Sequence, residues 1–244
     1  MRRIILCEGE TDATLIGLYL EKICDWTYAN PKNKIINIPK NTAGGNKSAT
    51  HYSNGNESLV ICSVGGKDNF GQFFTKYVYP MIKTVNKEEN LYRIALITDD
   101  DDRNISDIEA DISEQLSYCI QSVSNNIWCS NLFEGDFDDN ISVDFLLCVI
   151  PKEGSGALET VLLDSLAESQ EGKSIVDSSV EFVDNMPYYS YIPTDRLKLK
   201  AKLGVALSII YPDKVFSQFD KQLQIVDWSK STTLSDCLSE VIKI

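Results

Sequence analysis

The sequence contains a single histidine, and its seven cysteines are dispersed without a Cys-x-x-Cys pair. A zinc site built from Cys and His needs several such ligands at close spacing, so this class of site is excluded. His51 lies in a segment rich in Asn, Gly and Ser that we expect to be a loop, which argues against a His-based catalytic triad. Most cysteines lie in apolar runs, so we expect free thiols in a reducing, cytoplasmic environment.

Basic residues are also scarce. The 244 residues include 23 Lys and Arg against 36 Asp and Glu, which gives a net charge of −13. Proteins that bind duplex nucleic acid usually carry stripes of Lys and Arg. The acidity therefore argues against tight, metal-free binding of nucleic acid. It favours a short or single-stranded substrate bound through metal ions, or a partner protein that provides the contacts to the nucleic acid.

Long apolar runs are absent. No run approaches the roughly 18 residues that a membrane-spanning helix needs, so we expect no membrane association. We expect no signal peptide either, because Met1-Arg2-Arg3 is followed by only four apolar residues before Glu8.

The chain does contain short apolar runs that alternate with helical patterns. Four runs predict strands buried on both faces, at residues 4–7, 59–64, 92–98 and 144–150, and a further short strand is expected at 34–38. Helices are expected at about 12–23, 70–85, 106–122 and 158–167. This order predicts an α/β domain, residues 1–168, with a parallel four-stranded sheet flanked by helices. Residues 169–244 are expected to form a mostly helical C-terminal extension packed on the same core, with helices ending near 211 and at 233–242.

Carboxylates follow the first and third predicted strands. Glu8 comes directly after the first strand and Asp12 about one helical turn later, while Asp99 to Asp102 follow the third strand. Ligands of open α/β sheets bind at the carboxyl ends of the strands, so we expect these acids to meet at one edge. The alternative for the first segment is that Thr11 or Asp12 only caps a helix and Glu8 is exposed.

The run of four aspartates is the most informative of these segments. Carboxylates about 4 Å apart repel by about 4 kcal/mol at an effective dielectric of 20, and a bound cation offsets that repulsion. Because side chains alternate along a strand, we expect Asp99 and Asp101 to form an inward pair that holds Mg²⁺ or Mn²⁺. Asp100 and Asp102 would then point away or cap the next helix. A solvated acidic turn is the alternative.

Gly65-Gly66-Lys67 follows the second strand but lacks the Walker A spacing, so a tight turn is favoured over a phosphate loop. Gly66, Lys67 and Asn69 are nonetheless predicted to contact the substrate.

The order of these motifs resembles the Toprim fold. Glu8-Gly9-Glu10-Thr11-Asp12 after one strand and Asp99-x-Asp101 after a later strand carry the resemblance, which covers about residues 1–168. The chain is most similar to standalone Toprim-like proteins close to the branch of OLD-family nucleases. Gly156-Ala157-Leu158-Glu159 resembles the G-x-L-E element of that branch, and Lys200-Ala201-Lys202 resembles its C-terminal lysine element. The chain departs from the branch at Ala157, where a hydroxyl ligand is usual.

This resemblance implies phosphoryl transfer at one or two Mg²⁺ or Mn²⁺ ions, with hydrolysis of nucleic-acid phosphodiesters as the expected reaction. The implied metal ligands are Glu8, Asp12, Asp99, Asp101 and Glu159. Glu8 is alternatively the general acid or base, and Lys200 or Lys202 would neutralise charge on the phosphate in the transition state.

Two other functions stay open. A non-catalytic or regulatory Toprim-like module would act through a partner such as a separate ATPase, because the sequence shows no ATPase domain of its own. A nucleotidyl-transfer or phosphatase-like enzyme would act on a small substrate. A homo-oligomer is open in each case.

Overall fold

The computed structural model describes residues 2–30, 36, 47–83, 91–117, 120–135, 140–187, 190–214 and 219–244. The chain divides into two compact units, one of residues 1–149 with 238–244 and one of residues 150–237. The boundary predicted at residue 168 lies inside the second unit, and as a boundary between folding domains it stays a prediction.

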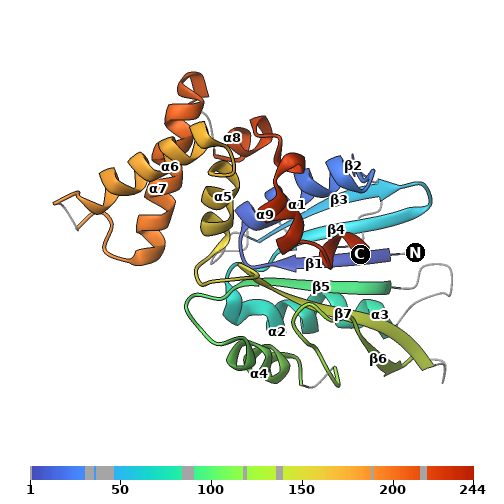
Figure 1. The fold of residues 1–244 in the computed structure, drawn as a ribbon. Coiled ribbons are helices and arrows are strands. Elements are labelled where there is room, and N and C mark those ends of the chain that lie inside the picture. The colour runs from blue at the N-terminus through green and yellow to red at the C-terminus, as the bar shows by residue number, and fades with distance from the viewer. Residues whose placement is uncertain are drawn as a thin grey trace. The chain divides into compact units, whose positions relative to one another are not determined.

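The first unit is built on a seven-stranded sheet with the order β2-β3-β4-β1-β5-β7-β6 (Figure 1). Its strands are β1 (Arg2–Cys7), β2 (Thr27–Ala29), β3 (Ser48–Asn54), β4 (Glu57–Ser63), β5 (Leu91–Asp99), β6 (Cys129–Glu134) and β7 (Asn140–Ile150). β1 pairs in parallel with β4 and with β5, whereas β2 with β3, β3 with β4, and β6 with β7 pair antiparallel. The α/β class is confirmed. The four predicted strands are present as β1, β4, β5 and β7, and three further strands extend the sheet.

Helices cover both faces of this sheet because its central strands are apolar on both faces. Ile4 and Leu6 of β1 share one buried cluster with α2 (Phe70–Phe73), η2 (Phe74–Val78), α3 (Tyr79–Lys83) and α4 (Ile105–Leu116). α1 (Glu10–Ile23) packs on β1 and β4 from the opposite face (Figure 1). β1 therefore lies in the middle of the unit, and its C-terminal end delivers Glu8 from a fixed scaffold.

The polar segment before residue 57 differs from the expected loop. Residues 48–54 form β3, and His51 pairs with Val60 of β4 and is only 5% exposed. Pairing with an apolar neighbouring strand overrides the weak strand preference of this Ser- and Asn-containing segment. The expected strand at 34–38 lies outside the described residues, apart from Ile36.

The second unit is mostly helical, as predicted. It contains α5 (Leu158–Leu166), α6 (Gln170–Asp184), α7 (Asp195–Ile210), η4 (Pro212–Lys214), α8 (Phe219–Ile225), η5 (Trp228–Lys230) and α9 (Thr232–Cys237). The helix predicted at 233–242 is shorter in the structure, where α9 ends at Cys237. The last residues, with η6 (Val241–Lys243), belong to the first unit, where the Arg3 guanidinium donates a 2.6 Å hydrogen bond to the Ile244 carbonyl.

The six described cysteines are free thiols, and burial raises the pKa of Cys7 and of Cys62. No helix among the described ranges combines the length and the apolar character needed to cross a membrane.

Candidate carboxylate site

Glu8 follows β1 directly and is 4% exposed. Its Oε1 accepts a short hydrogen bond from the Thr98 hydroxyl and a 3.0 Å bond from the Asp99 backbone N–H. Thr98 and Asp99 end the adjacent parallel strand β5. Glu8 therefore contacts the start of the aspartate run. The alternative interpretation, in which Glu8 is exposed and the segment only caps a helix, is wrong.

The aspartate run does not continue as a strand, although the sequence predicts strand geometry through Asp101. β5 ends at Asp99, and Asp101 and Asp102 have positive φ angles of 47° and 63°. Asp99 and Asp100 are each 5% exposed, and the Asp100 Oδ1 accepts a 2.9 Å bond from the Asp102 N–H. Side-chain alternation holds only within a strand, so the direction expected for Asp100 stays a prediction. Asn104, not an aspartate, occupies the N-cap of α4.

Asp12 lies in the first turn of α1, where its Oδ2 accepts a 2.7 Å hydrogen bond from the Gly9 N–H. A carboxylate at this position satisfies an amide at the helix N-terminus and complements the helix dipole. Both Asp12 and Glu8 lie close enough to Cys7 to raise the pKa of its thiol further, although burial is the larger cause. Asp12 is therefore a helix cap in the immediate neighbourhood of Glu8.

The Gly65-Gly66 turn supports Glu8 from the other neighbouring strand, β4. The N–H groups of Gly65 and Gly66 donate to the Glu8 carbonyl at 2.9 and 3.0 Å, and the two residues have φ angles of 83° and 116°. Glycine adopts this backbone region without the steric penalty of a Cβ. The Asn69 amide donates to the Gly65 carbonyl at 2.7 Å. Two of the predicted substrate contacts, Gly66 and Asn69, thus help to build the turn that holds Glu8.

Lys67 places its own positively charged ammonium group at this edge of the sheet. Its ammonium lies 2.7 Å from the Asp101 Oδ2, and both side chains are partly exposed. The Lys67 carbonyl accepts a 3.2 Å bond from the Gln115 amide, which ties the turn to α4. The partner of Lys67 is thus an acid of the site, and its predicted contact with substrate stays a prediction.

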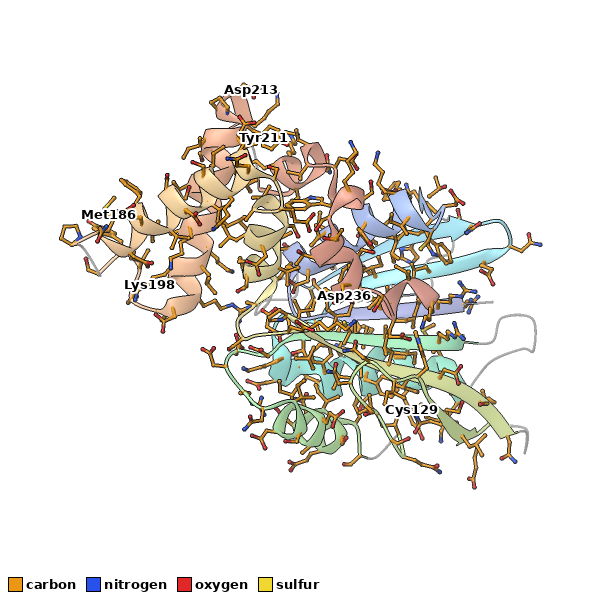
Figure 2. All side chains as sticks on the ribbon, viewed as in Figure 1. Cys129, Met186, Lys198, Tyr211, Asp213 and Asp236 are labelled. Atoms are coloured by element: carbon orange, nitrogen blue, oxygen red, sulfur yellow. The ribbon has the colours of Figure 1, made fainter. Side chains whose placement is uncertain are left out.

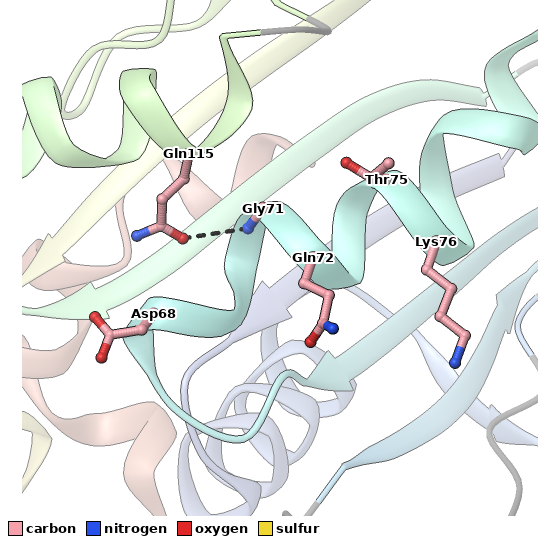
Figure 3. Close-up of a pocket in the computed structure, with 6 residues that line it drawn as sticks. All are labelled: Asp68, Gly71, Gln72, Thr75, Lys76 and Gln115. Carbon is pink, nitrogen blue, oxygen red and sulfur yellow. Dashed lines mark hydrogen bonds between the residues drawn. The ribbon is translucent and has the colours of Figure 1, made fainter.

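A cleft of about 440 Å³ begins one residue beyond Lys67. Figure 3 shows its lining, in which the Gly71 N–H donates to the Gln115 Oε1 at 3.2 Å. The other lining side chains are those of Asp68, Gln72, Thr75 and Lys76. The sequence carries no signal for this cleft, because its residues come from the turn at residues 67–69 and from α2, η2 and α4.

The remaining predicted residues lie in the second unit. Glu159, in the first turn of α5, is 6% exposed, and its Oε1 lies 3.7 Å from the Lys200 ammonium of α7. Lys202 instead pairs with Asp184 of α6 at 2.8 Å. Because α7 is helical, residues two positions apart point in nearly opposite directions. The two lysines therefore serve different partners, and Lys200 is the one that accompanies Glu159.

The donor set of the first unit suits a hard divalent cation, since Glu8, Asp12, Asp99 and Asp101 offer only oxygen ligands. Within the described parts of the chain, no group of three or more His, Cys, Asp or Glu side chains is arranged to hold a metal ion. The ligand chemistry therefore fits Mg²⁺ or Mn²⁺, and the side chains would have to converge further to bind it. Thr98, whose hydroxyl bonds Glu8, was missed from sequence, although it adjoins Asp99 in the chain.

No protein-family model and no curated protein matches this chain. Among solved structures, the chain is similar to the crystal structure of hypothetical protein PH0156 from Pyrococcus horikoshii OT3. The two are 17% identical over 99% of this chain and 100% of that chain, with a TM-score of 0.45.

Proposed function

We propose that this protein is a Toprim-like, divalent-metal-dependent nuclease that hydrolyses phosphodiester bonds in short or single-stranded nucleic acid. The observation that carries the proposal is the direct link between Glu8 and Asp99. The Asp99 N–H donates to the Glu8 carboxylate, and both side chains are about 5% exposed or less. Each of these residues is the first acid of one of the two motifs that carry the resemblance to Toprim nucleases.

Burial of several carboxylates at one sheet edge carries a large desolvation and repulsion cost. Removal of a carboxylate from water costs free energy, and nearby like charges add to that cost. A divalent cation that binds these carboxylates offsets both contributions. The same ion gives an acidic protein a positive group for a phosphate, which reconciles a net charge of −13 with a nucleic-acid substrate.

The first unit would hold the ion through Glu8 and Asp99, with Asp12 and Asp101 as further ligands. A bound Mg²⁺ or Mn²⁺ supplies Lewis-acid activation of water and stabilisation of charge on the phosphate. Glu8 is fixed by Thr98 and by the Gly65-Gly66 turn, so its carboxylate is pre-organised either to bind the ion or to move a proton.

The test is cleavage of end-labelled single-stranded DNA and RNA in Mn²⁺ and in Mg²⁺, with Asp99→Asn and Glu8→Gln as the informative variants. Loss of several kcal/mol of transition-state stabilisation predicts a drop of about 100- to 1,000-fold in kcat/KM for each variant. Glu10→Gln is the matched control, because Glu10 is an exposed acid two residues from Glu8. Wild-type rates in Asp99→Asn, or cleavage that chelation by EDTA leaves unchanged, would contradict the proposal.

A further inference from the structure

Helices α6 and α7 of the second unit frame an apolar pocket of about 310 Å³ that none of the predicted site residues lines. Its lining includes Phe182, Met186, Tyr191, Ile192, Ala201 and Val205. Figure 2 labels Met186 close to the end of α6. Two aromatic rings here are open to solvent, since Phe182 is 54% and Tyr191 is 85% exposed.

The sequence of α7 flanks this pocket with basic residues. Ala201 and Val205, four residues apart, lie on the helix face that lines the pocket. Lys200 precedes Ala201 and Lys202 follows it, so that the two lysines lie about 100° to either side of that face. Arg196 and Lys198 repeat the arrangement one turn earlier, around Leu197. Residues 195–202 therefore contain four basic residues and one acid, within a chain of net charge −13.

The ion pair of Lys198 is one that a phosphate could replace. Lys198 pairs with Asp195 of its own helix at 3.1 Å, and the Asp195 side chain is 90% exposed. Ion pairs with an exposed partner contribute little to stability, so exchange of one carboxylate for a phosphate has little cost. Figure 2 shows Lys198 in the first part of α7, at the same end of the helix pair as Met186.

We infer that this α6–α7 face, comprising Phe182, Tyr191, Arg196 and Lys198 with the pocket between the helices, binds single-stranded nucleic acid. Unpaired bases stack on Tyr191 and Phe182, and the phosphates contact Arg196 and Lys198. Aromatic rings beside cations are the recurring surface that binds single strands without sequence preference. Protein interfaces, in contrast, are depleted in lysine, which makes a protein partner the poorer match for this flank. The inference rests on the proposed function and assigns the α6–α7 face as the surface that binds the substrate of the nuclease.

The test is the fluorescence anisotropy of a fluorescein-labelled 12-nucleotide oligo-dT or oligo-U in EDTA at low salt, where cleavage does not occur and only the weaker, metal-independent part of binding is measured. Tyr191→Ala is expected to weaken binding about tenfold, the effect of losing one stacked base, whereas Tyr191→Phe keeps the affinity. Lys198→Ala is expected to lower the slope of log K against log salt by about 0.7, the value for one phosphate contact on a single strand.

Matched controls lie outside this face. Tyr28→Ala removes another exposed aromatic ring, 62% exposed in β2, and Lys173→Ala removes a 63% exposed lysine near the start of α6. Both variants are expected to bind like the wild type. Equal affinity and salt slope in Tyr191→Ala, Lys198→Ala and the wild type would overturn the inference. So would the absence of oligonucleotide binding with self-association that Tyr191→Ala abolishes, since that result assigns the face to a second copy of the chain.

Binding and cleavage separate this inference from the proposed function. Glu8→Gln is expected to bind the oligonucleotide like the wild type and to lose cleavage. Binding that depends on Tyr191 and Lys198, in a protein that never cleaves, would support the inference and contradict the nuclease. Cleavage that depends on Glu8, together with binding that Tyr191→Ala and Lys198→Ala leave unchanged, would support the nuclease and contradict the inference.

Discussion

Glu8 in the first unit and Glu168 in the second are both carboxylates that accept bonds from a hydroxyl and from backbone N–H groups. Glu168 is exposed and uses both oxygens. Its Oε1 accepts from Ser231 and Thr233 at 2.8 Å, and its Oε2 accepts from Thr232 at 3.2 Å. Glu8 is 4% exposed, and within the described chain both bonds to its side chain fall on Oε1.

This difference in exposure and hydrogen bonding distinguishes a carboxylate with a structural role from one that can bind a ligand. Burial would raise the pKa of Glu168, but the hydrogen bonds from Thr233, Ser231 and Thr232 outweigh it and lower the pKa to about 2. Glu168 is thus a cap for the start of α9. Glu8 carries the desolvation cost of burial with one carboxylate oxygen engaged, which leaves Oε2 for a metal ion or a proton.

The largest expected change comes from Thr98→Val, which removes the hydroxyl donor to Glu8 and keeps the shape of the side chain. A residue that orients a metal ligand typically contributes about 10- to 100-fold to metal affinity, so Mn²⁺ affinity is expected to fall by that factor. Isothermal titration with Mn²⁺ checks this, with the exposed Thr27→Val of β2 as the control. Equal affinities in the two variants would remove Thr98 from the site.

A smaller effect is expected for Glu168→Gln, on stability rather than on metal affinity. The folded pKa of about 2 lies below the ordinary value of 4.5, so the stabilisation is present above pH 4.5 and is lost as the pH falls toward 2. Because the side chain is exposed, we expect about 1 kcal/mol at pH 7 after solvent screening. Urea unfolding at pH 7 and near pH 2.5 measures it, with the exposed Glu153→Gln as the control. A difference that persists at the lower pH would show that another interaction is responsible.

The smallest effect is expected for Lys67→Met, which removes the cation beside Asp101. The pair is partly exposed, so its loss should change stability by about 0.5 kcal/mol or less, and Mn²⁺ affinity should rise about twofold as the competing cation disappears. Titration of Lys67→Met against Lys76→Met measures the change. Weaker Mn²⁺ binding in Lys67→Met would mean that Lys67 supports the metal site instead of competing with it.

The parts of the first unit that were predictable are those that burial alone determines. Unbroken apolar runs identified β1, β4, β5 and the end of β7, and parallel pairing of β1 with β5 then brings Glu8 beside Asp99. The edge strands β2 and β3 were not predictable in this way, since their polar sequences become strands only through pairing with β4 and with each other.

Side-chain directions at the site were harder to predict than its location. The burial of Asp100 depends on where β5 stops, and the backbone leaves the strand after Asp99 because Asp101 and Asp102 adopt positive φ. In the second unit, α6 has few apolar residues, and Val176 and Val183 are buried two turns apart in a Ser- and Asp-containing sequence. The helical state of α7 then decides that Lys200, not Lys202, lies beside Glu159.

The central claim is that Glu8 and Asp99 together hold a divalent ion, and Mn²⁺ binding followed by electron paramagnetic resonance tests it most directly. Wild type and Glu10→Gln are expected to bind Mn²⁺ with the same affinity, whereas Glu8→Gln and Asp99→Asn each bind at least about tenfold more weakly, as expected when a carboxylate ligand is lost. Wild-type affinity in both Glu8→Gln and Asp99→Asn, or no Mn²⁺ binding by the wild type, would contradict the claim.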